Sequence, residues 1–279
     1  MGILDEYFTL SNGIKHPKLG LGTYQLKPGE ETYHAVLEAL RLGIRHIDSA
    51  IIYRNESSVG EAIRDSGIAR EDIFITSKLP PHVKTRAGAL RMFEKTLKNL
   101  GVDYLDSYII NAPGPFHDLD GDYDAGNVEA YKTLEELYRD ERVAAIGVSQ
   151  FKIKDLENIL THCDIVPHVQ QISYFIGHRQ ESLVEYCQQK NIQIQAFSPL
   201  AKGYLFKHPL VQEVALKLNV TPAQLALRFI IDAGIAPIPK ASQPLHLREN
   251  TLLDFTINLE DYERLKAIVD DPRQYDDDI

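Results

Sequence analysis

Three residues of this sequence have types and spacing that permit acid–base chemistry. Asp48 and Tyr53 lie close together in the chain, and Lys78 follows a later apolar run. A lysine ammonium beside a tyrosine favours the phenolate, so we expect Lys78 to lower the pKa of Tyr53. A phenol tuned toward neutral pH can donate a proton to a carbonyl oxygen while a hydride reaches the carbon. The three residues therefore predict a site for carbonyl reduction with Tyr53 as the proton donor.

Other polar residues follow the remaining apolar runs, about one per run. The amide NH2 of Asn111 can donate a hydrogen bond to the same carbonyl oxygen. No side chain can donate a hydride, so this chemistry requires a nicotinamide cofactor. Unrelated loops would not supply one polar group per repeat, and we expect the following residues to meet in one site: Thr23, Asp48, Lys78, Asn111, Ser149, Gln150, Gln171, Ser198 and Lys240.

Short apolar runs that alternate with helical patterns supply the elements that bring these residues together. Repeated alternation of strand and helix predicts a parallel sheet, and eight repeats favour closure into a (β/α)8 TIM barrel. The chemistry of such barrels lies at the carboxyl ends of the strands. The expected strands cover residues 19–22, 44–47, 73–77, 104–110, 143–148, 166–170, 192–197 and 235–239.

Turn and capping residues support this architecture. Asn12-Gly13 lies between two apolar segments and predicts an N-terminal β-hairpin. Thr221-Pro222 suits the start of a helix. Because no linker or low-complexity stretch interrupts the chain, residues 1–279 are expected to form a single domain. Glycines suited to left-handed C-caps follow helical patterns over residues 32–42, 90–100 and 225–233, at Gly43, Gly101 and Gly234.

The composition is that of a globular protein with an acidic surface. Of 279 residues, 44% are hydrophobic and 25% are charged, and the formal net charge is −10. This charge disfavours binding to nucleic acid or to anionic membranes. No run approaches the ~20 apolar residues of a membrane span, and the first ten residues lack the pattern of a signal peptide. We expect a cytoplasmic protein that acts on a small molecule.

Weaker motifs point to other chemistry. The two cysteines lack zinc-ligand spacing and are expected to be free thiols. Acidic residues over 118–129 imitate an EF-hand, but Tyr123 stands where the sharp turn requires glycine. We therefore expect a solvated acidic loop and no metal site. Tyr186 and Lys190 have the spacing of the short-chain dehydrogenase pair, but no glycine-rich turn follows the first strand.

Several blocks of the sequence resemble the aldo-keto reductase family, over nearly the whole chain. Residues 43–60, GIRHIDSAIIYRNESSVG, are similar to a family signature and carry Asp48 and Tyr53. The likeness is to the small, monomeric members of the 2,5-diketo-gluconate-reductase and aldose-reductase type. It implies a (β/α)8 barrel, a monomer, and NADP(H)-dependent interconversion of carbonyl compounds and alcohols. Further blocks in the family's order are GLGTY, ITSKLP, AAIGVSQF, HVQQISY, QAFSPLAKG and PIPKASQPLHLREN.

The resemblance also implies roles for individual residues. Asp48 and Lys78 would set the pKa of the general acid Tyr53, and Asn111 would take the fourth catalytic position. Residues that would bind the cofactor are Gly22, Thr23, Ser149, Gln150, Gln171, Phe197, Ser198, Leu200, Lys240, Ala241, Ser242, His246, Arg248, Glu249 and Asn250. Those that would hold its carboxamide are Ser149, Gln150 and Gln171. Residues that would line the substrate pocket are Tyr24, Ile52, Pro80 and Ala112.

Departures from the family pattern concern the pocket. The family usually has histidine in a His-Trp-Pro block where this chain has Asn111-Ala112-Pro113. Asparagine can donate to a carbonyl oxygen but cannot carry a proton, and the potassium-channel β-subunits of the family share it. Turnover is therefore expected to be slow or tuned to an unusual substrate. Loss of the tryptophan, with Tyr24 where another is often found, predicts a roomier pocket.

The expected cofactor is NADP(H), with NAD(H) less favoured. Lys240 stands where the family binds the adenosine 2′-phosphate, and Arg248 lies in the following helix, so we expect two basic groups at a helix N-terminus. Ala241 and His246 replace a frequent serine and arginine. The acidic tail, residues 270–279, is expected to contribute little, so specificity should depend on the loops after the first and fourth strands.

Two functions fit these observations. The first is an NADPH-dependent reductase of aldehydes and ketones, because Asp48, Tyr53 and Lys78 are all present. The alternative is a nicotinamide-binding sensor or regulatory protein with attenuated reductase activity, suggested by Asn111 and Gln150. We favour the enzyme because a sensor need not keep the acid, the lysine and the aspartate together.

Overall fold

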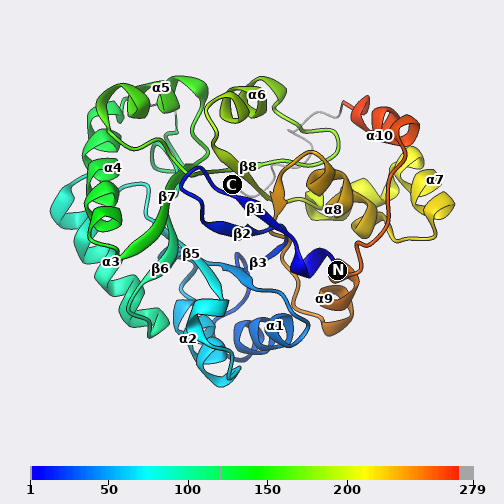
Figure 1. Ribbon diagram of the computed structural model, residues 1–279, viewed down its shortest axis with the longest axis horizontal. Helices are drawn as coiled ribbons and strands as arrows, with labels where there is room; N and C mark the ends of the chain where they lie inside the picture. Colours follow the sequence, from blue (N-terminus) through cyan, green and yellow to red (C-terminus); the bar gives the residue numbers. More distant parts are fainter. Residues whose placement is uncertain (1, 120, 270–279) are drawn as a thin grey trace.

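Eight parallel strands form a barrel in the computed structural model, which describes residues 2–119 and 121–269 (Figure 1). Neighbouring strands follow one another in chain order. The Gly22 N–H donates to the Pro239 carbonyl at 3.1 Å and so joins the first strand to the end of the last. The predicted TIM barrel is confirmed. Its strands are β3 (Gly20–Gly22), β4 (His46–Asp48), β5 (Phe74–Leu79), β6 (Leu105–Ile110), β7 (Val143–Ser149), β8 (Val169–Ser173), β9 (Gln193–Phe197) and β10 (Ala236–Pro237).

The predicted strand over residues 166–170 is displaced, because β8 begins at Val169 and ends at Ser173. Pro167 has no N–H to donate to a sheet ladder, and it precedes the strand. The displacement places Gln171 inside the strand, where the sequence predicted the strand end. The last strand is also shorter than predicted, since β10 contains Pro237 and is followed by Pro239.

Helices surround the barrel and bury their apolar faces against it (Figure 1). Gly43, Gly101 and Gly234 all have positive φ, as predicted for residues that end helices. Thr221 and Gln224 form the reciprocal hydrogen bonds of a capping box. The helices are α1 (Glu30–Arg41), α2 (Glu56–Asp65), α3 (Arg86–Leu100), α4 (Asp124–Arg139), α5 (Ile153–His162), α6 (Glu181–Gln189), α7 (Pro209–Leu218), α8 (Pro222–Asp232), α9 (Pro244–Thr251) and α10 (Leu259–Lys266).

The predicted hairpin is present and lies across the amino-terminal end of the barrel (Figure 1). Its strands, β1 (Tyr7–Thr9) and β2 (Lys15–Pro17), pair antiparallel. Leu10 packs against the first part of β7 and the start of β8, and the Asn12 side chain donates to the Ala144 carbonyl at 2.9 Å. The hairpin therefore closes one end of the barrel and leaves the carboxyl ends of the strands for the site.

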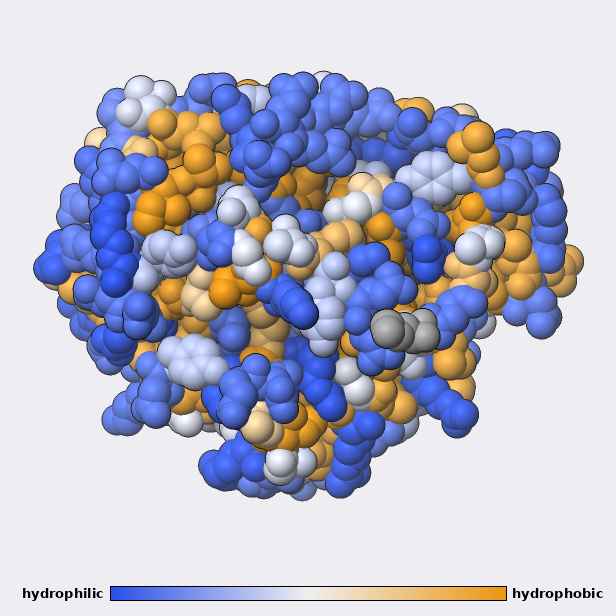
Figure 2. Space-filling model, viewed as in Figure 1, coloured by the Kyte–Doolittle hydropathy of each residue, from blue (hydrophilic) through white to orange (hydrophobic). Residues whose placement is uncertain are grey.

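Hydrophilic residues cover most of the rim of the face seen in Figure 2, in keeping with the net charge of −10. Among the described residues, no single helix combines the length and hydropathy that a membrane span requires. Only α7 and α8 taken together pass that test, and they are bent by 90° at their break. A single domain over residues 1–279 remains our proposal.

Candidate active site

A buried ion pair lies at the carboxyl ends of β4 and β5. The Lys78 ammonium donates to Asp48 Oδ1 at 2.5 Å and to the Ser49 carbonyl at 2.9 Å. The second oxygen of Asp48 accepts from the Gln171 amide at 2.8 Å. Burial opposes the charge on Lys78, but Asp48 and Tyr53 together outweigh burial and raise the lysine pKa. A buried ion pair is stable only when its remaining hydrogen-bond donors and acceptors have partners. Here the Ser49 carbonyl accepts from Lys78, and the Gln171 amide donates to Asp48.

Tyr53 is held beside this pair by a turn of 3-10 helix, Ile51–Tyr53, which directly follows the end of β4. The Lys78 ammonium lies 4.9 Å from the centre of the Tyr53 ring. Arg54 then takes a left-handed conformation with φ of 60°, which ends the turn. The structure thus brings Asp48, Tyr53 and Lys78 together.

The net effect on the Tyr53 pKa is opposite to the one we expected from the sequence. Burial raises the pKa of Tyr53 above its usual value, and Lys78 opposes this only in part. The Asp48 charge also raises it. Lys78 lowers the pKa of Tyr53 as expected, but burial outweighs it because a buried phenol loses the hydration that favours the anion. Tyr53 is therefore protonated at neutral pH, which is the state that a proton donor needs.

Asn111 follows β6 and is buried, with 4% of its surface exposed. Within the described residues, its side-chain NH2 has no hydrogen-bond partner. A buried donor without an acceptor costs about 1–3 kcal/mol, so this group fits a ligand oxygen. The Gln150 side chain donates to the Asn111 main-chain carbonyl at 3.2 Å. Gln150 thus contacts the Asn111 backbone.

Gln171 projects from β8 and links two side chains inside the barrel. Its amide nitrogen donates to Asp48 Oδ2 and to Gln195 Oε1, both at 2.8 Å. Gln195, on β9, in turn meets His16 of the hairpin at 2.8 Å. Neither Gln195 nor His16 was expected from the sequence. Gln195 could have been found as a polar residue between the apolar Ile194 and Ala196 of β9, whereas His16, between Lys15 and Pro17 in β2, gives no such signal.

Residues expected at the substrate pocket divide into two groups. Tyr24 is exposed, and its ring centre lies 5.0 Å from that of Tyr53. Ile52 is partly buried in the turn before Tyr53. Pro80 and Ala112 follow β5 and β6 but are buried, and Ala112 has no exposed surface. Tyr24 and Ile52 are therefore the two of these residues that keep exposed surface.

Residues expected near the nicotinamide lie at the carboxyl ends of their strands. Thr23 is fully buried, and its hydroxyl donates to the Asp48 carbonyl at 3.0 Å. This hydrogen bond helps to fix the backbone at the end of β4. Gly22 is also buried, and Ser149 ends β7. Phe197 ends β9 and is partly buried, and Ser198 and Leu200 follow it.

Residues expected near the adenosine lie around α9. Lys240 is exposed just before this helix, and His246 is exposed in its first turn. Arg248 lies in the last turn of α9, so of the two basic groups expected at the helix N-terminus only Lys240 lies on that side of the helix. The remaining residues expected at this end are Ala241 and Asn250, which are buried, and Ser242 and Glu249, which are partly buried.

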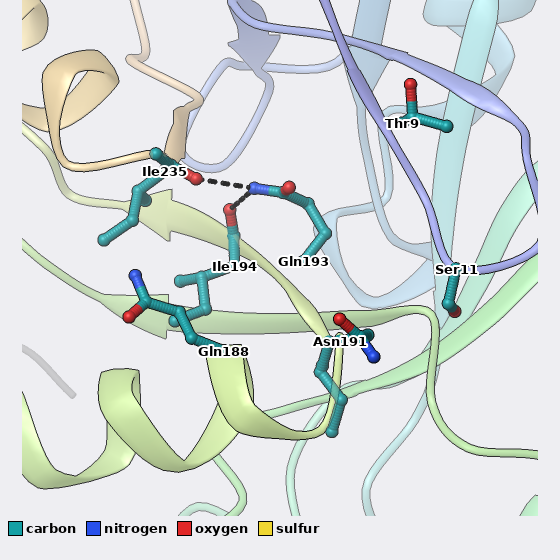
Figure 3. A pocket seen from close by; sticks show the side chains of 9 residues that line it. Thr9, Ser11, Gln188, Asn191, Gln193, Ile194 and Ile235 are labelled. Carbon is teal, nitrogen blue, oxygen red and sulfur yellow. Dashed lines mark hydrogen bonds between the residues drawn. The ribbon is translucent and has the colours of Figure 1, made fainter.

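A separate cavity of about 350 Å³ lies beside the hairpin, at the amino-terminal end of the barrel (Figure 3). Hydroxyl and amide side chains line it, among them Thr9, Gln188 and Asn191. Gln193 also lines it and donates to the Ile194 and Gly234 carbonyls. No charged side chain is among its lining residues. It lies at the end opposite to Tyr53 and is not the candidate active site.

The acidic segment is not wholly a loop, because α4 begins at Asp124. Tyr123 donates its hydroxyl to Asp118 at 2.8 Å, while Asp120 lies outside the described residues. Within the described part of the chain, no group of three or more His, Cys, Asp or Glu side chains is placed to hold a metal ion. The acidic tail, residues 270–279, lies outside the described residues.

Comparison with known proteins agrees with this fold. A model of the aldo/keto reductase family matches residues 18–270. The chain is 36% identical to the glyoxal reductase of Bacillus subtilis, over 97% of this chain and 95% of that protein. It is 33% identical to the glycerol 2-dehydrogenase (NADP(+)) of Saccharomyces cerevisiae, over 94% and 90%. A solved aldo/keto reductase from Brucella melitensis matches with a TM-score of 0.87 and 37% identity, over 94% of this chain and 99% of that chain. The chain belongs to the aldo/keto reductase family.

Proposed function

We propose that this protein is an NADP(H)-dependent oxidoreductase that reduces small aldehydes and ketones to alcohols, with Tyr53 as the proton donor. The observation that carries the proposal is the buried pair of Asp48 and Lys78 beside a protonated Tyr53. The likeness to a glyoxal reductase supports a small carbonyl substrate. We also propose that the protein acts as a cytoplasmic monomer.

The residues present fit a nicotinamide cofactor. The unpartnered NH2 of Asn111 requires an acceptor oxygen, and a carbonyl substrate beside the cofactor has one. Gln171 and Ser149 would hold the carboxamide, and Phe197 would contact the ring. When bound, the cofactor would supply the hydride that no side chain can supply. Residues that would contact its phosphates and adenosine are Ser198, Leu200, Lys240, Ala241, Ser242, His246, Glu249 and Asn250.

In the proposed mechanism, the Tyr53 hydroxyl transfers its proton to the substrate oxygen as negative charge develops there. Lys78 stabilises the phenolate that remains, and Asp48 keeps the ammonium in place. The NH2 of Asn111 donates to the same oxygen and orients the carbonyl. Asn111 cannot exchange a proton, so Tyr53 alone supplies it.

NADP(H) is proposed over NAD(H) because Lys240 and His246 lie at the start of α9. An exposed lysine before a helix N-terminus favours a bound phosphate, as does the helix dipole. The likeness to a dehydrogenase named for NADP(+) points the same way. Measured dissociation constants for NADPH and NADH would decide between them.

The test compares wild type with Tyr53→Phe by following NADPH oxidation with glyoxal, methylglyoxal, simple aldehydes and ketones. Loss of the proton donor is expected to lower kcat by about 100-fold or more, the usual contribution of a general acid. Binding of NADPH, followed by its fluorescence, is expected to stay within about threefold of wild type, because the hydroxyl alone is removed. Equal activity of the two proteins would contradict the assignment of Tyr53.

A further inference from the structure

A continuous line of hydrogen bonds crosses the barrel interior from the catalytic pair to the hairpin. Asp48 accepts from Gln171, which donates to Gln195, and Gln195 meets His16. Each of these contacts is 2.8 Å long. His16 and Gln195 have no exposed surface, and Asp48 and Gln171 have 2% each. The line therefore reaches from the carboxyl ends of the strands to the element that closes the opposite end.

Hydrogen-bonding chemistry allows one direction along this line. The ionised Asp48 can only accept, so Gln171 must present its NH2. Both N–H groups of Gln171 are then used, one on Asp48 and one on Gln195 Oε1. Gln195 consequently turns its own NH2 toward His16 Nε2, which must accept. Reversing the amides would bring the Gln171 oxygen against the Asp48 carboxylate.

His16 suits the role of a terminal acceptor. Burial lowers its pKa to about 4, so the ring is neutral and can leave one nitrogen without a proton. The ring is held by edge contacts with His46 and Phe74, each with centres 4.8 Å away. His46 Nε2 forms a hydrogen bond with the Thr76 hydroxyl at 3.0 Å, so His46 is not part of the line.

The hydrogen bonds of this line use both N–H groups of the Gln171 amide. Gln171 can therefore bind a ligand only through its side-chain oxygen. We propose that His16 and Gln195 are positioning residues for the cofactor site, holding Gln171 so that its oxygen accepts from the carboxamide NH2 of the nicotinamide. This inference rests on the proposed function, since it requires a nicotinamide nucleotide to bind.

The proposal predicts discrimination between two pyridine substituents. A carboxamide offers N–H groups to the Gln171 oxygen, whereas the acetyl group of 3-acetylpyridine adenine dinucleotide phosphate offers none. Wild type is expected to bind NADP+ about tenfold more tightly than the acetylpyridine analogue, the difference that one hydrogen bond makes. Without the acceptor at His16, the buried NH2 of Gln195 is unsatisfied, so Gln195 no longer holds the second N–H of Gln171 in place. The Gln171 amide is then anchored by Asp48 alone, its oxygen loses its fixed direction, and the discrimination should weaken.

The experiment measures dissociation constants of NADP+, the acetylpyridine analogue and 2′,5′-ADP by titration calorimetry. The variants are His16→Phe, which keeps a ring, and Gln195→Leu, which removes the amide. The matched control is His46→Leu, from the same ring cluster but outside the line. Both test variants should reduce the preference for NADP+ to less than about threefold. Neither should change the affinity for 2′,5′-ADP, which lacks the nicotinamide, and His46→Leu should keep the preference.

A preference that persists in folded His16→Phe and Gln195→Leu would overturn the proposal. So would a wild type that binds NADP+ and the analogue equally. If wild type bound no nicotinamide nucleotide, the proposed function would be overturned together with this inference. That outcome differs from the two above, in which the nucleotide still binds. Circular dichroism and thermal unfolding check folding, and if one test variant does not fold, the other decides.

Discussion

At the scale of single residues, burial and charge compete for each proton of the site. Lys78 stays charged because its interactions with Asp48 and Tyr53 together outweigh burial, whereas Tyr53 stays protonated because burial outweighs the effect of Lys78. The two residues adjoin the same carboxylate, yet their pKa values rise for different reasons. The result is an ammonium next to a neutral phenol at neutral pH, which is the arrangement that proton donation requires.

The Asp48–Lys78 pair should show strong non-additivity. Lys78→Met is expected to cost about 3–5 kcal/mol of stability, because it leaves a buried carboxylate unpaired. The double variant Asp48→Asn with Lys78→Met should be less destabilised than Lys78→Met alone. Urea unfolding of wild type, Asp48→Asn, Lys78→Met and the double variant gives the coupling free energy between the two residues. Additive effects would mean that water already reaches the pair.

Asn111 should show a trade-off between stability and activity. Asn111→Leu removes a buried donor without a partner, so stability is expected to stay equal or to rise slightly. The kcat with a small aldehyde should fall by about 100-fold, as when a donor to a developing oxyanion is removed. Steady-state kinetics and thermal unfolding measure the two effects. A stable variant with undiminished kcat would remove Asn111 from the mechanism.

At the scale of elements, the barrel places the site by closing on itself. The close approach of β3 to the end of β10 leaves no room for a side chain at Gly22. A Cβ atom there would lie 2.6 Å from the Ile238 carbonyl oxygen, a rigid backbone atom. Prolines on both sides of that contact limit how far β10 can extend, and they explain why our prediction of its length was too long.

Gly22→Ala is therefore expected to destabilise the protein by about 1–3 kcal/mol, the usual cost of overpacking. Gly2→Ala is the matched control, because its φ of −88° suits any residue and its Cβ would come no closer than 3.0 Å, to the carboxylate end of the Asp254 side chain. Thermal unfolding should show a clear loss for the first and little change for the second. Equal stability of both variants would mean that the barrel opens readily between β3 and β10.

At the scale of the whole molecule, the buried histidines couple folding to pH. The pKa of His16 is about 4 in the folded protein and near 6.5 in an unfolded chain. Between these values the unfolded chain binds a proton that the folded protein does not. Stability from this residue is therefore complete above pH 6.5 and is lost as pH falls toward 4.

From pH 7 to pH 5, this term should lower the stability of wild type by about 2 kcal/mol. His16→Phe removes the titrating group, so its stability should fall less over the same interval. Urea unfolding at both pH values, for wild type and variant, isolates the contribution of His16 from those of the carboxylates. If wild type and His16→Phe lost the same free energy of unfolding between the two pH values, the His16 ring would take up its proton without unfolding of the protein.

The sequence by itself determined the barrel and the hairpin, and it predicted the residues of the proposed catalytic group. Alternating apolar runs, helix-ending glycines and the Asn12-Gly13 turn are local signals, and one polar residue at the end of each run marked the side that carries the chemistry. Only the tertiary structure decided the sign of the Tyr53 pKa shift, the shortened β10, and the place of Arg248 in the last turn of α9.

The line from Asp48 to His16 belongs to the tertiary structure as well. Its last contact joins residues 179 positions apart, and it forms because barrel closure turns inward-facing side chains from β4, β8 and β9 toward one axis. No local pattern records which inward side chains meet there. Burial and long-range contact arise from the fold as a whole, and the protonation and hydrogen-bond direction of the site depend on both.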